Sequence, residues 1–153
     1  MQHIKGQMTA HGWTSRSDES KTRILEQLRD MVTELRSVTP PEGTKVSSIE
    51  GGPFYDCRLP SRLYWGPYAS VRKFHEALVD NIPWDAEYTN YPDLVELFEF
   101  YRQVENEIVL THGDLSSLNI LARGDRVVGI VDWETAGWFP AYWEYTTARY
   151  VNP

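Results

Sequence analysis

Four polar side chains with the chemistry of a reaction centre gather in one short stretch of the chain. His112, Asp114 and Asn119 fall within eight residues, and Asp132 follows thirteen residues after Asn119. A carboxylate can accept the proton of a hydroxyl group, and carboxylate and amide oxygens are the ligands that Mg²⁺ prefers in proteins. These residue types therefore predict acid-base chemistry beside a hard cation.

Short apolar runs must position these side chains. IVLT, NILA and VVGIV are bounded by Gly, Asp and Asn, which is typical of short buried strands and the loops between them. If the second and third runs pair as a hairpin around Arg123–Asp125, Asp132 adds a second oxygen ligand to that of Asn119. Both side chains would then face one pocket with Asp114.

Structural roles compete with these chemical ones. For Asp114 and Asn119 alone, an Asx-turn is as well supported as catalysis, and Asp125 is expected to be a turn residue. Glu134 has two open interpretations: it lies near the metal or substrate, or it accepts hydrogen bonds from the backbone beside Trp133.

The spacing H-G-D-L-x-x-x-N, followed by the Asp of I-V-D-W-E, resembles the aminoglycoside phosphotransferase family, which shares the protein-kinase fold. Residues 51–61 and 132–145 are similar to its fungal members. The resemblance implies ATP-dependent phosphoryl transfer to a hydroxyl group of a small molecule. It makes Asp114 the catalytic base and His112 a loop-organising residue. It also implies that Asn119 and Asp132 hold Mg²⁺ on the ATP phosphates.

The rest of the pattern predicts a mostly helical α+β chain with short β-hairpins that carry the catalytic and metal loops. Apolar residues recur every three or four positions, which predicts helices over 17–38, 70–81 and 92–104, and a fourth helix is expected near 140–149. The segment 45–61, rich in Gly and Pro, is expected to be a loop on the substrate side and outside the core.

The resemblance covers the large lobe of the kinase fold. A Gly-rich phosphate loop and a strand Lys are not recognisable, so residues 1–153 are expected to be a single, incomplete domain without the N-terminal lobe. We expect weak nucleotide binding and slow or absent transfer by this chain alone. Two alternatives stay open: a pseudokinase-like ligand-binding or scaffold protein, and a nucleotide-independent acid-base enzyme that uses Asp114 and His112.

Composition narrows the partners. The net charge of −7 disfavours nucleic acid, no run is long enough for a membrane span or a signal peptide, and Cys57 is the single cysteine, so a cytoplasmic protein is expected. Residues 76–107 hold nine carboxylates and one cation, which suits a cationic substrate or a solvated helix face. The face left open by the absent lobe is expected to favour self-association or a partner chain.

Overall fold

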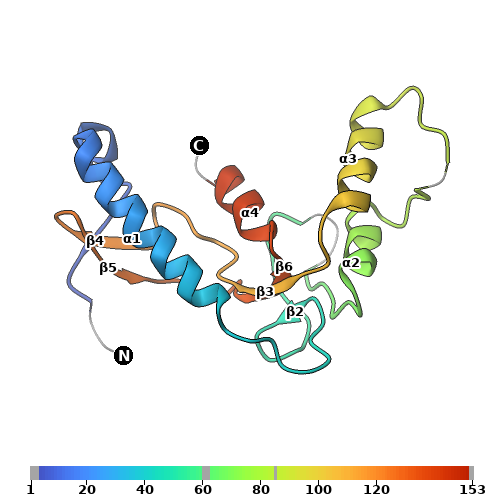
Figure 1. The fold of residues 1–153 in the computed structure, drawn as a ribbon, viewed down its shortest axis with the longest axis horizontal. Coiled ribbons are helices and arrows are strands. Elements are labelled where there is room, and N and C mark those ends of the chain that lie inside the picture. Colours follow the sequence, from blue (N-terminus) through green and yellow to red (C-terminus); the bar gives the residue numbers. More distant parts are fainter. Residues whose placement is uncertain (1–3, 60–62, 85, 152–153) are drawn as a thin grey trace.

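The computed structural model describes residues 4–59, 63–84 and 86–151, and this part of the chain is α+β. Its elements in chain order are β1 (Gln7–Met8), the 3₁₀ helix η1 (Trp13–Ser15), α1 (Asp18–Arg36), β2 (Ser47–Ser48), α2 (Val71–Leu78), α3 (Pro92–Gln103), β3 (Ile108–Thr111), β4 (Ile120–Arg123), β5 (Arg126–Ile130), β6 (Gly137–Pro140) and α4 (Trp143–Val151). Figure 1 shows α1 with β4 and β5 at one end, α2 and α3 at the other, and α4 between them. None of the described helices is long and apolar enough to cross a membrane.

The first three helices form where the apolar periodicity predicts them. The hydroxyl of Ser17 accepts a hydrogen bond from the backbone N–H of Ser20 and so caps α1, and Ser70 caps α2 in the same way. Pro92 occupies the first turn of α3, where its missing N–H costs nothing. The helix predicted to end at Asn81 ends at Leu78, because the two residues before Ile82 adopt a left-handed backbone.

Two small antiparallel sheets hold the loops together. One has the strand order β1-β4-β5 and the other β2-β6-β3. Arg123 pairs with Arg126, so β4 and β5 form a hairpin with Gly124 and Asp125 as its turn, as predicted. The helix α1 lies against β5 and β3, and it therefore touches both sheets.

The prediction for the last helix is wrong at its start. Residues 137–140 form the central strand β6, all four of them buried, and α4 begins at Trp143. The sequence Gly-Trp-Phe-Pro shows no alternation of apolar and polar residues because both faces of β6 are covered, and such a run cannot be assigned by periodicity. The two-residue strands β1 and β2, which precede the predicted β-rich part, are also missing from the prediction.

The prediction that 45–61 lies outside the core is also wrong. Val46 and Phe54 are almost fully buried, and the ring of Phe54 packs edge-on against Phe139 at 4.8 Å between centroids. The segment pairs locally with the chain that follows it, through Val46 with Tyr68 and Phe54 with Trp65. The sequence pattern does not reveal these core residues. They stand in a turn-rich segment and form isolated β-bridges instead of a strand with a recognisable alternation. Residues 60 and 61 lie outside the described residues.

The packing of α2 against α3 and β6 buries a histidine. His75 is 1% exposed, its ring stacks on Tyr101 at 4.0 Å, and its Nε2 lies 2.7 Å from the hydroxyl of Tyr142. Burial lowers the pKa of His75 from 6.5 to about 4 and raises the pKa of Tyr101 to about 12. The histidine is therefore neutral in the folded protein at neutral pH.

This burial predicts a pH dependence of stability. Because the pKa of His75 is lower in the folded than in the unfolded chain, its contribution is complete above about pH 6.5 and is lost as the pH falls toward 4. The slope approaches about 1.4 kcal/mol per pH unit in that window. Urea titrations at several pH values should show this slope diminished in His75→Gln. The control His11→Gln removes an exposed imidazole; an equal loss of slope in both variants would contradict the assignment.

Candidate active site

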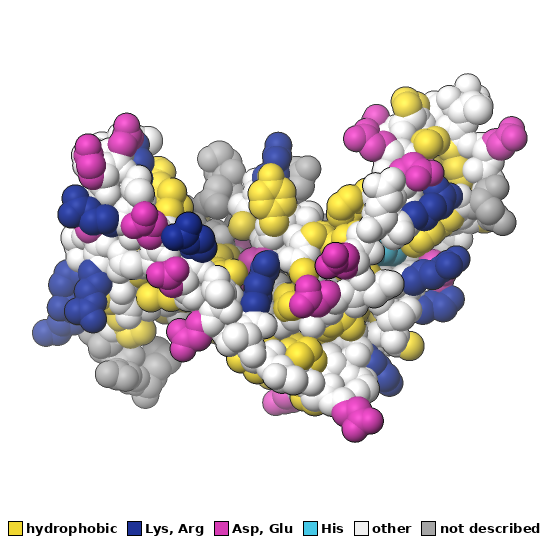
Figure 2. Space-filling model, viewed as in Figure 1, with side chains coloured by type: hydrophobic (Ala, Val, Ile, Leu, Met, Phe, Trp, Pro, Cys, Tyr) yellow, Lys and Arg dark blue, Asp and Glu magenta, His cyan; other side chains and the backbone are white. Residues whose placement is uncertain are grey.

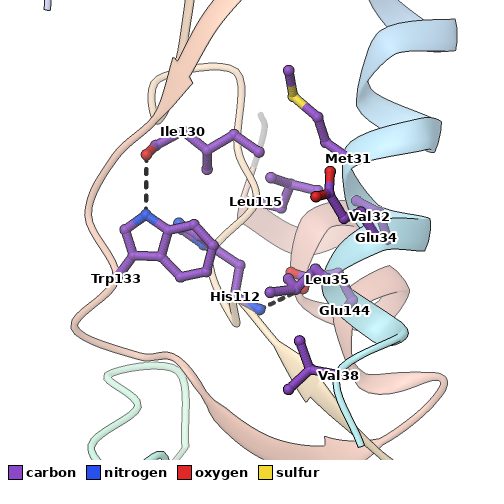
Figure 3. A pocket seen from close by; sticks show the side chains of 10 residues that line it. All are labelled: Met31, Val32, Glu34, Leu35, Val38, His112, Leu115, Ile130, Trp133 and Glu144. Atoms are coloured by element: carbon purple, nitrogen blue, oxygen red, sulfur yellow. Dashed lines mark hydrogen bonds between the residues drawn. The ribbon is translucent and has the colours of Figure 1, made fainter.

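The loop between β3 and β4 is organised by the ring of His112. Its Nδ1 accepts a hydrogen bond from the backbone N–H of Asp114 at 3.2 Å, and its Nε2 lies 3.0 Å from the carbonyl oxygen of Val131. One acceptor and one donor nitrogen correspond to the neutral tautomer with the proton on Nε2. The ring is buried and meets Trp133 at 4.5 Å between centroids (Figure 3). Both ring nitrogens are thus occupied by the backbone.

The loop brings Asp114 and Asn119 into direct contact. The amide Nδ2 of Asn119 donates to the carboxylate Oδ2 of Asp114 at 2.8 Å and to its backbone carbonyl at 3.0 Å. Oδ1 of Asp114 accepts no hydrogen bond in the described part of the chain, and 27% of this side chain is exposed. The two carboxylate oxygens therefore differ: one is fixed and the other is open to a ligand.

Asn119 and Asp132 flank the open end of the β4–β5 hairpin, Asn119 just before β4 and Asp132 two residues after β5. The backbone N–H of Val131 donates to the carbonyl of Asn119 at 2.9 Å, which extends the β4–β5 ladder by one pair and places Asp132 next along the chain. Asp132 is exposed and has a left-handed backbone, φ 66°. A conformation that costs about 1–2 kcal/mol in an L-residue is often found where a side chain must be aimed.

These residues suit a hard cation. Because Asn119 donates through its nitrogen, its amide oxygen is left as a ligand atom, and Asp132, just after β5, carries an exposed carboxylate. No group of three or more His, Cys, Asp and Glu side chains placed for a metal ion occurs among the residues described. An amide oxygen and a carboxylate could serve as the few protein ligands that Mg²⁺ takes.

A buried carboxylate from α4 holds the start of this loop. Glu144 is 5% exposed, and its two oxygens accept the backbone N–H groups of His112 at 2.7 Å and of Gly113 at 3.2 Å. Hydrogen bonds to an ionised group are about twice as strong as neutral ones. The hydroxyl of Thr135 donates to the carbonyl of His112 at 3.1 Å, so this turn is held from two elements.

An ion pair from the 45–61 segment holds the other side of the loop. Arg58 is fixed by Asp56 through two 2.7 Å hydrogen bonds, donates to the carbonyl of Gly113, and places Nη1 3.7 Å from Oδ1 of Asp114. Burial alone would lower the pKa of Arg58, but the hydrogen bonds and charge of Asp56 and the charge of Asp114 raise it overall. Arg58 therefore stays a cation beside the open oxygen of Asp114.

A hollow of about 390 Å³ lies behind the loop, against α1. Figure 3 shows its lining, with the apolar side of α1 facing the loop and the base of α4. The lining residues are Met31, Val32, Glu34, Leu35, Val38, His112, Leu115, Ile130, Trp133 and Glu144.

Sequence reasoning missed the residues that hold the loop, Arg58, Asp56 and Glu144. All three stand in the segments that carried the family resemblance, but a single sequence does not reveal which distant side chains meet one backbone. The predicted sites His112, Asp114, Asn119 and Asp132 lie on one loop and its adjoining hairpin. Glu134 is exposed, and its side chain forms no hydrogen bond or ion pair within the described ranges.

Gly113 offers a sharp test of the loop geometry. Its φ is +84°, and a Cβ would lie 2.5 Å from the carbonyl oxygen of Thr135. Gly124 also has a positive φ, +60°, but a Cβ there would meet nothing within 4 Å. We expect Gly124→Ala to cost about 1–2 kcal/mol of stability and Gly113→Ala about 1–3 kcal/mol more, from overpacking. Equal losses in urea titrations would show that Gly113 is not confined as described.

Glu144 offers a second test. In Glu144→Gln the amide nitrogen cannot accept a hydrogen bond, so one of two buried N–H groups loses its partner, at a cost of about 1–3 kcal/mol. Amide exchange followed by NMR should accelerate at His112 and Gly113. The control Glu34→Gln removes a charge from the same hollow without touching a loop N–H. Unchanged amide exchange in Glu144→Gln would show that the Glu144 carboxylate does not hold the backbone of His112 and Gly113.

Comparisons with known proteins identify the family of this chain. A model of the phosphotransferase enzyme family matches residues 1–151. No curated protein and no solved structure matches the chain. The family is the one that the His-Gly-Asp motif predicted, and the match extends over nearly the whole chain, far beyond that motif. The prediction is confirmed: the chain belongs to the phosphotransferase enzyme family.

Proposed function

We propose that this protein transfers the terminal phosphoryl group of ATP to a hydroxyl group of a small molecule, with Asp114 as the catalytic base. The contact between Asp114 and Asn119 carries the proposal. It fixes one carboxylate oxygen and leaves the other open to a substrate, on a loop whose backbone is held by the buried Glu144 and the half-buried Arg58. A general base needs this combination of a set direction and an open oxygen.

In this proposal Asn119 and Asp132 hold Mg²⁺ on the nucleotide phosphates. Support comes from the amide oxygen of Asn119, which its hydrogen bonds to Asp114 do not use, and from the position of Asp132. Asp132 directly follows Val131, whose backbone N–H donates to the carbonyl of Asn119. When bound, the ion neutralises charge that develops on the phosphate oxygens.

The substrate hydroxyl loses its proton and gains the phosphoryl group. The substrate hydroxyl gives its proton to Oδ1 of Asp114, its oxygen forms the new bond to phosphorus, and the bond from phosphorus to ADP breaks. Arg58 keeps its own proton and lies 3.7 Å from that oxygen, so a positive charge stands beside the proposed base. His112 takes no part in this proton transfer, since backbone groups occupy both its nitrogens.

We further propose that the described elements correspond to the large lobe of a kinase-like fold. The order of strand, catalytic loop, hairpin and metal-binding Asp supports it.

A cationic acceptor stays a proposal that rests on the acidic stretch 76–107. Two of its carboxylates are already paired: Glu76 with Arg72 and Lys73, and Glu99 with Arg102. Asp85 of this stretch lies outside the described residues.

Titration calorimetry with Mg²⁺ and ATP tests the assignment. We expect Asp132→Ala to weaken binding of the Mg²⁺–ATP complex at least about tenfold, because a charged ligand is removed. Asp114→Asn should bind it normally and lose transfer about 10²–10⁴-fold, the usual contribution of a general base. Asp30→Ala, an exposed change on α1, is the control.

Three results would contradict the proposal. Unchanged Mg²⁺–ATP binding in Asp132→Ala would remove the metal assignment. A turnover that needs no nucleotide and disappears in Asp114→Asn would favour the acid-base enzyme instead. If the unmodified chain binds no nucleotide at all, the pseudokinase-like alternative replaces the phosphotransferase.

A further inference from the structure

The helix α1 has an apolar face that the rest of the described chain covers only in part. Ile24 is fully buried against Ile120 and Val127. Leu25, one position along, is 54% exposed, and Leu28, Val32 and Leu35 are half-buried. The positions 25, 28, 32 and 35 follow the alternating three- and four-residue spacing of a coiled-coil seam.

A long hollow runs beside this seam. It encloses about 1000 Å³ and is lined on α1 from Ile24 to Arg36, a length of about 18 Å at 1.5 Å per residue. Trp13, Leu115 and Leu118 form the facing wall, and Leu118 is 52% exposed. Val32 and Leu115 also line the smaller hollow of Figure 3, so the two hollows adjoin along α1, and the smaller one has Glu34 and Glu144 in its lining. In Figure 2 hydrophobic side chains lie along the side of α1 that is turned toward α4.

The charge of this hollow is opposite to that of the whole chain. Its lining contains two arginines and no Asp or Glu, although the net charge of the protein is −7. Arg29 makes no ion pair with any described residue, and Arg36 donates only to the carbonyl of Ala141. The two arginines are seven residues apart and therefore flank the seam on the same side, where coiled coils carry the charges that select a partner.

We propose that this hollow is a docking groove for an amphipathic helix of a partner polypeptide that carries carboxylates. Its apolar residues, spaced by three and four, would pack between α1 and the wall formed by Trp13, Leu115 and Leu118. Its Asp or Glu side chains would lie opposite Arg29 and Arg36. The groove spans more than three helical turns along α1, which matches a helix bound along the groove, and the arginines fix the sign of the partner's charge.

The probe is a peptide of three heptads with Leu at positions a and d and Glu at positions e and g. Its twin carries Lys in place of Glu, and in each peptide the like charges oppose self-association. Calorimetry at low salt should show the Glu peptide binding at least about tenfold more tightly than the Lys peptide. The double variant Arg29→Glu, Arg36→Glu should reverse this preference.

Single substitutions distinguish binding in the groove from nonspecific hydrophobic binding elsewhere on the surface. Leu25→Asp and Leu118→Asp alter exposed side chains, so the fold should persist by circular dichroism while the affinity for both peptides falls about tenfold or more. Val95→Asp on α3, at a similarly exposed apolar residue, should leave binding unchanged.

Three outcomes would overturn the proposal: no binding of either peptide, equal binding of both, or a dimer of the chain alone that Leu25→Asp dissociates. The last would place a second copy in the groove. None of these measurements needs nucleotide or turnover, so failure here is distinct from failure of the phosphotransferase assignment.

Discussion

The geometry of the candidate site depends on how one residue, Gly113, is held. Its N–H is bound by the carboxylate of Glu144 and its carbonyl by the guanidinium of Arg58. Its φ of +84° and the contact with Thr135 leave no room for a side chain. The charged groups come from α4 and from the 45–61 segment, so the shape of the loop depends on two distant parts of the chain. Asp114 is the next residue, so the conformation of Gly113 sets the direction in which the Asp114 side chain points.

The sequence allowed good predictions where a pattern is local. The apolar periodicity of α1 to α3 and the Gly124–Asp125 turn each depend on neighbours within a few residues, and the structure has them close to where they were predicted. The placement of Asp114, Asn119 and Asp132 on one loop and its adjoining hairpin could be predicted for the same reason, because these segments are contiguous, and their chemical roles stay a proposal.

What could not be predicted depends on contacts between distant segments. The strand β6 is buried between β2 and β3, and its four residues carry no alternation to reveal it. Val46 and Phe54 are core residues inside a segment whose glycines and prolines are typical of a surface loop. Glu144 looked like one more acidic residue in a helix, and Arg58 like a charge in a loop, since their hydrogen bonds to the backbone of residue 113 span 31 and 55 positions.

The loop is thus held by polar contacts on the sides of α4 and the 45–61 segment, while toward α1 it faces hollows lined by hydrophobic side chains. Leu115 follows Asp114 and lines both hollows, and His112 and Glu144 line the smaller one. Hydrogen bonds to ionised groups give the loop direction, but they do not fill the space behind it. A side chain that entered from the α1 side would pack directly against residues next to the proposed base. The apolar face of α1 and the phosphoryl-transfer loop therefore share one wall, and they cannot be treated as separate surfaces of this protein.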